Sequence, residues 1–319
     1  MNINTKFLSL EIKSPIIIGS SPLTADFKTI KKCADQGAGA VVLKSIFEER
    51  IANEVADMLS SLDSPESHDY LSSYLKQGDL DRYTTLIKEC KAELDIPVIA
   101  SVNCKTSGEW IDYCKKIEDA GADALELNIF YMPASKTESS QEIEARYLKV
   151  VEDVVKHCSI PLCVKLSSRF TNPIYMINEL CKRGVKGVTM FNRFWEPDFD
   201  ISKFEIVSVS AMSSPRELNT NLRYVSQAAS ANIPVDICAS TGVYTSDDIV
   251  KYILAGASTV QVCSVLFSAG ISVIGDLNSQ LLAWMESHGF SSINEFKGKM
   301  LSDKDQTMHT RFQFMKQFD

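Results

Sequence analysis

The sequence predicts an α/β fold, a (β/α)8 or TIM barrel with insertions at the C-terminal face of its strands. Short apolar runs alternate along the chain with amphipathic segments of helical period, as expected of a parallel sheet with crossover helices. One junction, in which a helix end leads through a tight turn into a new strand, occurs as DQGAGAVVL, DAGADALEL, KRGVKGVTM and LAGASTVQV. Ordinary helix capping in an open, doubly wound sheet would also produce such junctions, and that fold is the alternative.

The apolar runs predict eight strands, at Ile16–Gly19, Ala40–Leu43, Val98–Val102, Ala124–Leu127, Leu162–Lys165, Gly187–Phe191, Val235–Ala239 and Thr259–Val262. The segments between and after them predict helices at Asp26–Gln36, Asp81–Glu93, Gly108–Asp119, Ser140–Cys158, Pro173–Arg183, Pro215–Ala231, Ser246–Leu254 and Val265–His288. The links after the second and sixth strands, residues 45–80 and 192–214, are long, and they leave the strand ends where barrels place their chemistry. No low-complexity linker interrupts the pattern, so we expect a single domain over residues 1–319.

Composition and charge argue against several classes of function. The chain has a formal net charge of −8 with scattered basic residues, which is unlike a surface for nucleic acid or anionic membrane. No apolar run approaches the roughly 20 residues that span a bilayer, and the N-terminal residues contain no signal-peptide core, so we expect a cytoplasmic protein. The nine cysteines form no CxxC pair and are expected to be reduced, and the four histidines are far apart, so we expect no metal site.

The segment from Pro234 to Phe267 contains two consecutive strand–turn–helix units with small residues at their turns. Thr241-Gly242 lies in the first turn and Cys263-Ser264 in the second. Such turns present backbone N–H groups beside helix N-termini, where they can hold a phosphate dianion. In a (β/α)8 barrel this phosphate site usually follows the seventh and eighth strands, which is where these turns are expected.

Polar residues at the ends of the predicted strands are the candidates for binding and catalysis, because those ends face the mouth of a barrel. The set is rich in amides and lysines and poor in carboxylates, and it comprises Ser20, Ser21, Lys44, Ser45, Asn103, Asn128, Lys165, Asn192, Thr241, Gly242, Cys263 and Ser264. It favours an anionic ligand with a polar heterocycle. Lys44 and Lys165 each close an apolar run, and two such lysines in one mouth would need an anion to offset their charge. Each could instead reach solvent, pair with an acid, or form a Schiff base as in an aldolase.

The chain resembles the class 1 dihydroorotate dehydrogenases in blocks spread almost from end to end. These blocks are SPIIIGSS, VVLKSIFEER, IASVNCKTSGEW, DALELN, PLCVKLS, STGVYTSDDIVKYILAGASTVQVCSVLF and SSINEFKGKM. The resemblance implies a flavin enzyme on a (β/α)8 barrel, with the phosphate of FMN on Thr241-Gly242 and Cys263-Ser264. It also implies contacts to flavin or substrate from Ser20, Lys44, Ser45, Asn103, Asn128, Lys165 and Asn192. Lys165 would then lie near the flavin N1–C2=O edge and stabilise negative charge there.

The resemblance breaks down in the part of the site that holds substrate. Family members carry a Ser-Cys-Pro-Asn run shortly after the strand-4 Asn, and its Cys is the catalytic base. Here Tyr131 takes the Cys position and Pro133 the position of the second Asn. Tyr131 could act as the base or could form a wall of the pocket. A family Asn in the loop after the second strand has no counterpart in the Ser-Leu-Asp-Ser-Pro-Glu-Ser run. Arg193 replaces a family Ser and could bind a substrate carboxylate or form a surface salt bridge.

We therefore expect an FMN-dependent oxidoreductase acting on a CH–CH bond, with Lys44, Asn128, Tyr131 and Lys165 as the catalytic residues. Dihydroorotate or another dihydropyrimidine-like or enoate compound would be its substrate. The alternatives are a flavin-binding barrel without dihydroorotate activity and a Schiff-base phosphosugar aldolase. The chain has no ferredoxin-type Cys cluster, so an unidentified acceptor must take the electrons, and aromatic residues around Phe194–Phe204 suggest a homodimer contact.

Overall fold

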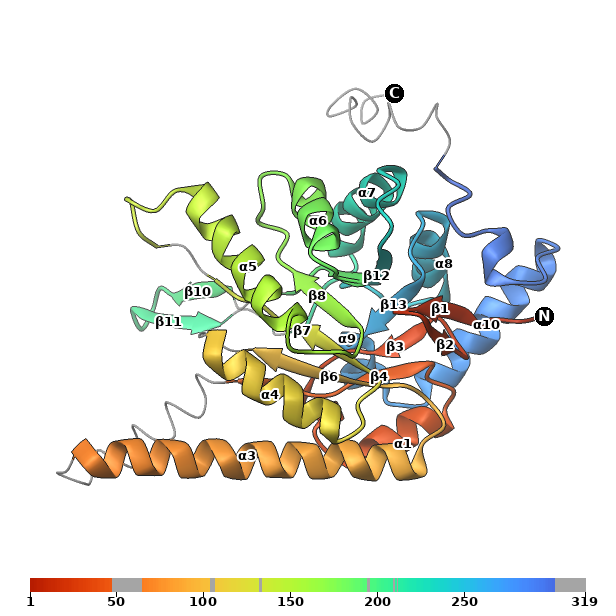
Figure 1. Cartoon of the computed structure of the whole chain (residues 1–319). Helices are drawn as coiled ribbons and strands as arrows, with labels where there is room; N and C mark the ends of the chain where they lie inside the picture. The colour runs from red at the N-terminus through yellow and green to blue at the C-terminus, as the bar shows by residue number, and fades with distance from the viewer. Residues whose placement is uncertain are drawn as a thin grey trace.

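The computed structural model describes residues 1–47, 65–103, 107–131, 134–193, 196–208, 210 and 212–301. Within these ranges the strands close into a parallel barrel and the helices surround it, so the predicted (β/α)8 fold is confirmed (Figure 1). The barrel strands are β3 (Ile16–Ile18), β4 (Ala40–Val42), β6 (Val98–Asn103), β7 (Ala124–Leu127), β8 (Leu162–Leu166), β9 (Gly187–Met190), β12 (Asp236–Ser240) and β13 (Thr259–Val262). Pairing of Val260 with Ile16 joins β13 to β3 and completes the circle.

The helices are α1 (Phe27–Asp35), α3 (Pro65–Glu93), α4 (Ser107–Asp119), α5 (Ser140–Val155), α6 (Pro173–Lys182), α7 (Glu217–Ser230), α8 (Ser246–Leu254), α9 (Ser264–Ala269) and α10 (Val273–Ser287). Short 3-10 helices, η1 (Pro22–Thr24) and η2 (Ile293–Glu295), are also present. Gly37, Gly121, Gly184 and Gly256 follow helices with φ between +89° and +101°, as the sequence predicts.

Three predicted helix boundaries are wrong. The single C-terminal helix expected over Val265–His288 is two helices, because Gly270 adopts φ +82° and ends α9. The helix expected to begin at Asp81 begins at Pro65, so α3 extends far past the barrel wall (Figure 1). Helix α5 ends at Val155, which leaves Cys158 in the following loop.

An N-terminal hairpin of β1 (Thr5–Phe7) and β2 (Leu10–Ile12) closes the end of the barrel where the strands begin. Phe7 and Leu8 are fully buried there, and they pack with the apolar residues Ile12, Ile17, Ala40, Val42, Ile99, Ala124, Cys163 and Cys238. A Cβ atom at Gly187 would lie 2.5 Å from Leu8 Cδ2, so a side chain on β9 would exclude this plug. A ligand therefore reaches the barrel interior from the opposite end, at the carboxyl ends of the strands.

A second hairpin follows β9 and comprises β10 (Pro197–Asp200) and β11 (Glu205–Ser208). It lies at the other end of the barrel from the β1–β2 hairpin (Figure 1). Its apolar side chains are largely exposed, at 68% for Phe199, 93% for Phe204 and 69% for Ile206. Phe194, at the start of the predicted contact surface, lies outside the described residues.

No helix within the described ranges is both long enough and apolar enough to cross a bilayer.

Candidate functional site

A layer of polar side chains fills the barrel directly above the apolar plug. Alternate residues of a strand face the same side, so Glu126 lies above Ala124 and Lys165 above Cys163. All members of the layer are at most 9% exposed, and they are Ser101, Glu126, Lys165, Thr189 and Gln261. Of these, only Lys165 was expected from the sequence. The signal for the others was a polar residue inside an apolar run, such as the Glu of LEL or the Gln of TVQV.

Lys165 is held by side chains from two other strands. Its ammonium Nζ donates to Gln261 Oε1 over 3.2 Å and lies 4.0 Å from Glu126 Oε1. Gln261 Nε2 and Thr189 Oγ1 both donate to Glu126 Oε2, over 2.7 and 2.8 Å. These contacts fix the lysine, whose ordinary flexibility would otherwise let it reach solvent.

A cavity of about 180 Å³ opens directly above Lys165 at the carboxyl ends of the strands. It brings together most of the expected cofactor ligands, namely Ser20, Lys165, Asn192, Thr241, Gly242, Cys263 and Ser264. Asn128 adjoins them, since Asn192 Nδ2 donates to Asn128 Oδ1 over 2.8 Å. Burial raises the pKa of the Cys263 thiol, so this group stays neutral near pH 7.

The expected phosphate cradle forms one side of this cavity. Thr241 and Gly242 have φ of +78° and +79°, and a Cβ atom at Gly242 would lie 2.6 Å from the backbone N of Leu218. Only glycine therefore lets the turn lie against the start of α7.

Ser213 occupies this cradle and was not predicted from the sequence. Gly242 N–H donates to Ser213 Oγ over 3.2 Å, and the Ser213 hydroxyl donates to Ser264 Oγ over 3.0 Å. Ser264 Oγ also accepts the Ser213 N–H over 2.9 Å. A phosphate that used these donors would have to displace the Ser213 hydroxyl or share them with it.

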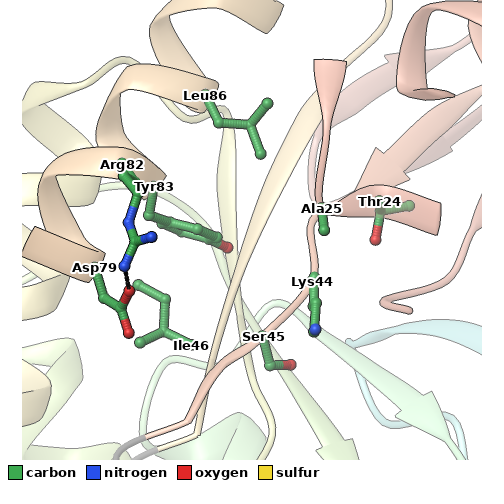
Figure 2. A pocket seen from close by; sticks show the side chains of 9 residues that line it. All are labelled: Thr24, Ala25, Lys44, Ser45, Ile46, Asp79, Arg82, Tyr83 and Leu86. Carbon is green, nitrogen blue, oxygen red and sulfur yellow. Dashed lines mark hydrogen bonds and ion pairs between the residues drawn. The ribbon is translucent and has the colours of Figure 1, made fainter. Parts of the chain in front are cut away.

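Lys44 lies in a neighbouring cavity of about 220 Å³, not in the one above Lys165. Figure 2 shows its side chain beside Ser45 and across the cavity from the Asp79–Arg82 ion pair on α3. The two cavities meet at a chain of hydroxyls, in which Ser45 Oγ is 3.2 Å from Ser20 Oγ and 2.6 Å from Ser101 Oγ.

Tyr83 on α3 lines this second cavity (Figure 2). Its hydroxyl donates to the carbonyl of Ser101 over 3.1 Å and accepts the Ser101 N–H over 2.7 Å. Strand β4 ends at Val42 and the short β5 (Ile46–Phe47) rejoins β6 only at Val102, so the hydroxyl substitutes for a strand partner. Burial raises the pKa of Tyr83 well above its ordinary value, which keeps this hydroxyl protonated.

Asn103 ends β6 opposite Phe47 and lines neither of these two cavities.

The structure places the Tyr131 hydroxyl in an ion-pair cluster away from Lys165. It donates to Glu138 over 2.8 Å and accepts from Arg146, whose guanidinium lies 5.0 Å from the tyrosine ring centroid. Together with aromatic residues such as Tyr147 and Phe170, the Tyr131 side chain lines a third cavity between α5 and the loop after β8. Met132 and Pro133, which follow it, lie outside the described residues, as do residues 61–64 of the loop that lacks the family Asn.

Arg193 lines the cavity above Lys165 and pairs with Glu217 at the start of α7, with Nε 3.4 Å from the carboxylate. Its side chain is 21% exposed, so it is neither a free surface cation nor fully enclosed. The two uses expected for Arg193, a salt bridge and an anion contact, are therefore compatible in this position.

Comparison with known proteins connects this geometry to a family. The family described as "Dihydroorotate dehydrogenase" matches residues 2–285. The catalytic subunit of dihydroorotate dehydrogenase B (NAD(+)) from Thermoplasma acidophilum is 26% identical over 309 residues, which cover 93% of this chain and 98% of the relative. The corresponding subunit from Alkaliphilus metalliredigens is 27% identical over 324 residues, covering 94% and 99%. The NAD-dependent dihydropyrimidine dehydrogenase subunit PreA of Escherichia coli is 23% identical over 319 residues, covering 93% and 76%.

Proposed function

Because the chain belongs to the dihydroorotate dehydrogenase family and is an oxidoreductase of that type, we propose that it is FMN-dependent and acts on a CH–CH bond. The substrate we propose is a dihydropyrimidine or a related compound. Relatives named for dihydroorotate and for dihydropyrimidines both support this class.

The observation that carries the proposal is the buried Lys165 ammonium on the floor of the cavity beside the cradle. Its ammonium donates one hydrogen bond to Gln261 Oε1 and lines the cavity, so its other donors can reach a flavin ring that gains electron density on reduction. The cradle at the other side of the cavity offers the N–H of Gly242 and the hydroxyls of Ser213 and Ser264, which suit a phosphate. The donor set therefore fits FMN, with Ser213 as a ligand or as a group that moves aside.

When bound, FMN would supply the acceptor for the hydride that leaves the substrate carbon. Lys165, held by Gln261, would stabilise the negative charge that develops beside it. Asn128 and Asn192, which are hydrogen-bonded to each other, would orient the amide edge of the substrate, because an amide offers both a donor and an acceptor. Lys44 would act from the neighbouring cavity, where its ammonium would offset negative charge that a ligand brings near the Ser20 and Ser45 hydroxyls.

A second candidate is a flavin-binding barrel without dihydroorotate activity. The position of Tyr131 favours it, because the hydroxyl that would act as the base is bonded to Glu138 and Arg146. A substrate whose oxidation does not need that base, or the absence of turnover, would be consistent with this arrangement. An aldolase acting through a Schiff base would need a free amine at Lys165, whereas Lys165 Nζ donates to Gln261 Oε1 over 3.2 Å.

The electrons must leave to an acceptor, and the relatives named as subunits suggest a partner protein. We propose such a partner or a soluble acceptor for this chain. We also propose a homodimer in which the exposed apolar residues of the β10–β11 hairpin are covered.

The test is anaerobic reduction of the reconstituted protein. The purified chain is loaded with FMN and mixed with dihydroorotate, dihydrouracil or dihydrothymine, while flavin absorbance is followed. We expect at least one of these compounds to bleach the flavin. A flavin that binds but is bleached by none of them would favour the second candidate, and a chain that binds no FMN would overturn both.

A further inference from the structure

The carboxylate of Glu126 is buried in the centre of the barrel, and one of its oxygens has no hydrogen bond. The side chain is 1% exposed. Oε2 accepts from Thr189 and Gln261, whereas Oε1 has no hydrogen-bond partner among the described residues. A buried acceptor without a partner is destabilising, so its presence here needs an explanation.

The group nearest to this oxygen with opposite charge is the Lys165 ammonium, 4.0 Å away. That separation is too long for a hydrogen bond but short enough for a strong charge–charge interaction in a buried setting. The ammonium donates one bond to Gln261 Oε1, so its remaining protons are available to a ligand in the cavity that it lines. The Glu126 carboxylate thus neutralises the charge of Lys165 from below without accepting any hydrogen bond from its ammonium.

The cysteine thiols in the barrel centre do not compensate the charge of Lys165. Cys163 and Cys238 lie below the pair in the apolar plug, and burial raises the pKa of both thiols, so they are neutral. Thr189 and Gln261 are uncharged. The electrostatic balance of the cavity floor therefore depends on Glu126 and Lys165.

We propose that Glu126 is the internal counter-ion of Lys165 and, by offsetting its charge, sets how readily a flavin ring bound in the cavity above accepts electrons. Glu126 is a positioning residue in this role, and the inference rests on the proposed function. With both charges present the cavity floor is neutral, so reduction of the ring to an anion is only partly offset. Without the carboxylate the floor carries a net positive charge, which stabilises the reduced ring more strongly.

The test compares Glu126→Gln, Lys165→Met and the double variant, each loaded with FMN. Sulfite affinity and the flavin reduction potential are measured, because sulfite adds to the ring and leaves it anionic without any turnover. Glu126→Gln should bind sulfite at least tenfold more tightly and raise the potential by the matching amount, about 30 mV for a two-electron couple. Lys165→Met leaves the floor negative and should change both quantities in the opposite direction, whereas the double variant has a neutral floor again and should stay within threefold of the parent.

Thr189→Val is the matched control, since it removes one hydrogen bond to Glu126 Oε2 and leaves every charge in place. Its sulfite affinity should stay within threefold of the parent. An unchanged affinity in Glu126→Gln would overturn the inference while leaving the proposed function intact. A double variant that binds sulfite as tightly as Glu126→Gln would also overturn it, because Lys165 would then supply no charge for Glu126 to offset.

If one of the variants does not fold, thermal unfolding of the single and double variants tests the counter-ion role instead. If Glu126→Gln alone unfolds because it leaves a buried ammonium uncompensated, the double variant carries neither charge and should regain a cooperative melting transition. A double variant as unstable as the single one would contradict the counter-ion role. A parent chain that folds but binds no FMN would overturn the proposed function together with this inference.

Discussion

At the scale of single residues, Lys165 brings a positive charge to a position that is 9% exposed. Its apolar run, PLCVK, predicted a strand-end lysine at the barrel mouth, and the structure places it on the cavity floor. Its partners could not be predicted, because Glu126 and Gln261 come from strands distant in sequence and become neighbours only when the barrel closes. The same holds for Ser213, whose hydroxyl reaches the cradle from a loop without a recognisable motif.

Replacing Lys165 by Met should slow reduction of bound FMN by substrate at least about 100-fold, because it removes the ammonium that stabilises negative charge on the reduced ring. Stopped-flow absorbance measures this rate. Lys182→Met is the control, since Lys182 is 62% exposed and pairs with Glu179 on its own helix. Reduction rates that are alike in the two variants would remove Lys165 from the mechanism.

Changing Tyr131 to Phe should alter turnover by no more than about threefold, because its hydroxyl is bonded to Glu138 and Arg146. Steady-state turnover of the best substrate, measured across pH, checks this. A loss near 100-fold, with disappearance of a basic limb in the pH profile, would instead identify Tyr131 as the base.

At the scale of elements, strand and helix order follow from the sequence, whereas long insertions do not. The junctions that contain glycine predict the helix ends correctly, because each glycine supplies the positive φ that the end of the helix requires. The extension of α3 and the β10–β11 hairpin were missed, since both lie in long insertions without clear periodicity. The N-terminal plug was missed because its two strands have three residues each.

Tyr83→Phe tests the contact between α3 and the barrel wall. Loss of the hydroxyl leaves the Ser101 N–H and carbonyl unpaired in a buried site, which should lower the free energy of unfolding by about 2 kcal/mol. Urea denaturation measures this. Tyr175→Phe, at a tyrosine that is 51% exposed, should change stability by less than about 0.5 kcal/mol. Equal effects in the two variants would contradict the role given to Tyr83.

Gly242→Ala tests the turn that forms the cradle. The new Cβ would lie 2.6 Å from a backbone nitrogen of α7, so the turn must shift, and FMN affinity should fall at least tenfold. Riboflavin affinity should fall less, because riboflavin carries no phosphate. Gly289→Ala is the control: its φ is also positive, at +73°, but no atom lies within 4 Å of the added Cβ. Equal losses for FMN and riboflavin would place the phosphate elsewhere.

At the scale of the whole molecule, the barrel is closed at one end and polar at the other. The β1–β2 hairpin seals the end where the strands begin, so the buried charges of Glu126 and Lys165 are accessible only from the carboxyl ends. The exposed β10–β11 hairpin is at that same open end (Figure 1), where a partner that accepts electrons would have to approach.

The most direct test of this account is titration of the purified chain with FMN and, separately, with riboflavin, followed by flavin fluorescence and gel filtration. We expect FMN to bind tightly enough to remain with the protein through the column, giving it a yellow colour, and riboflavin to bind at least tenfold more weakly. A folded, colourless protein that releases FMN on the column, or that binds the two flavins equally, would contradict it.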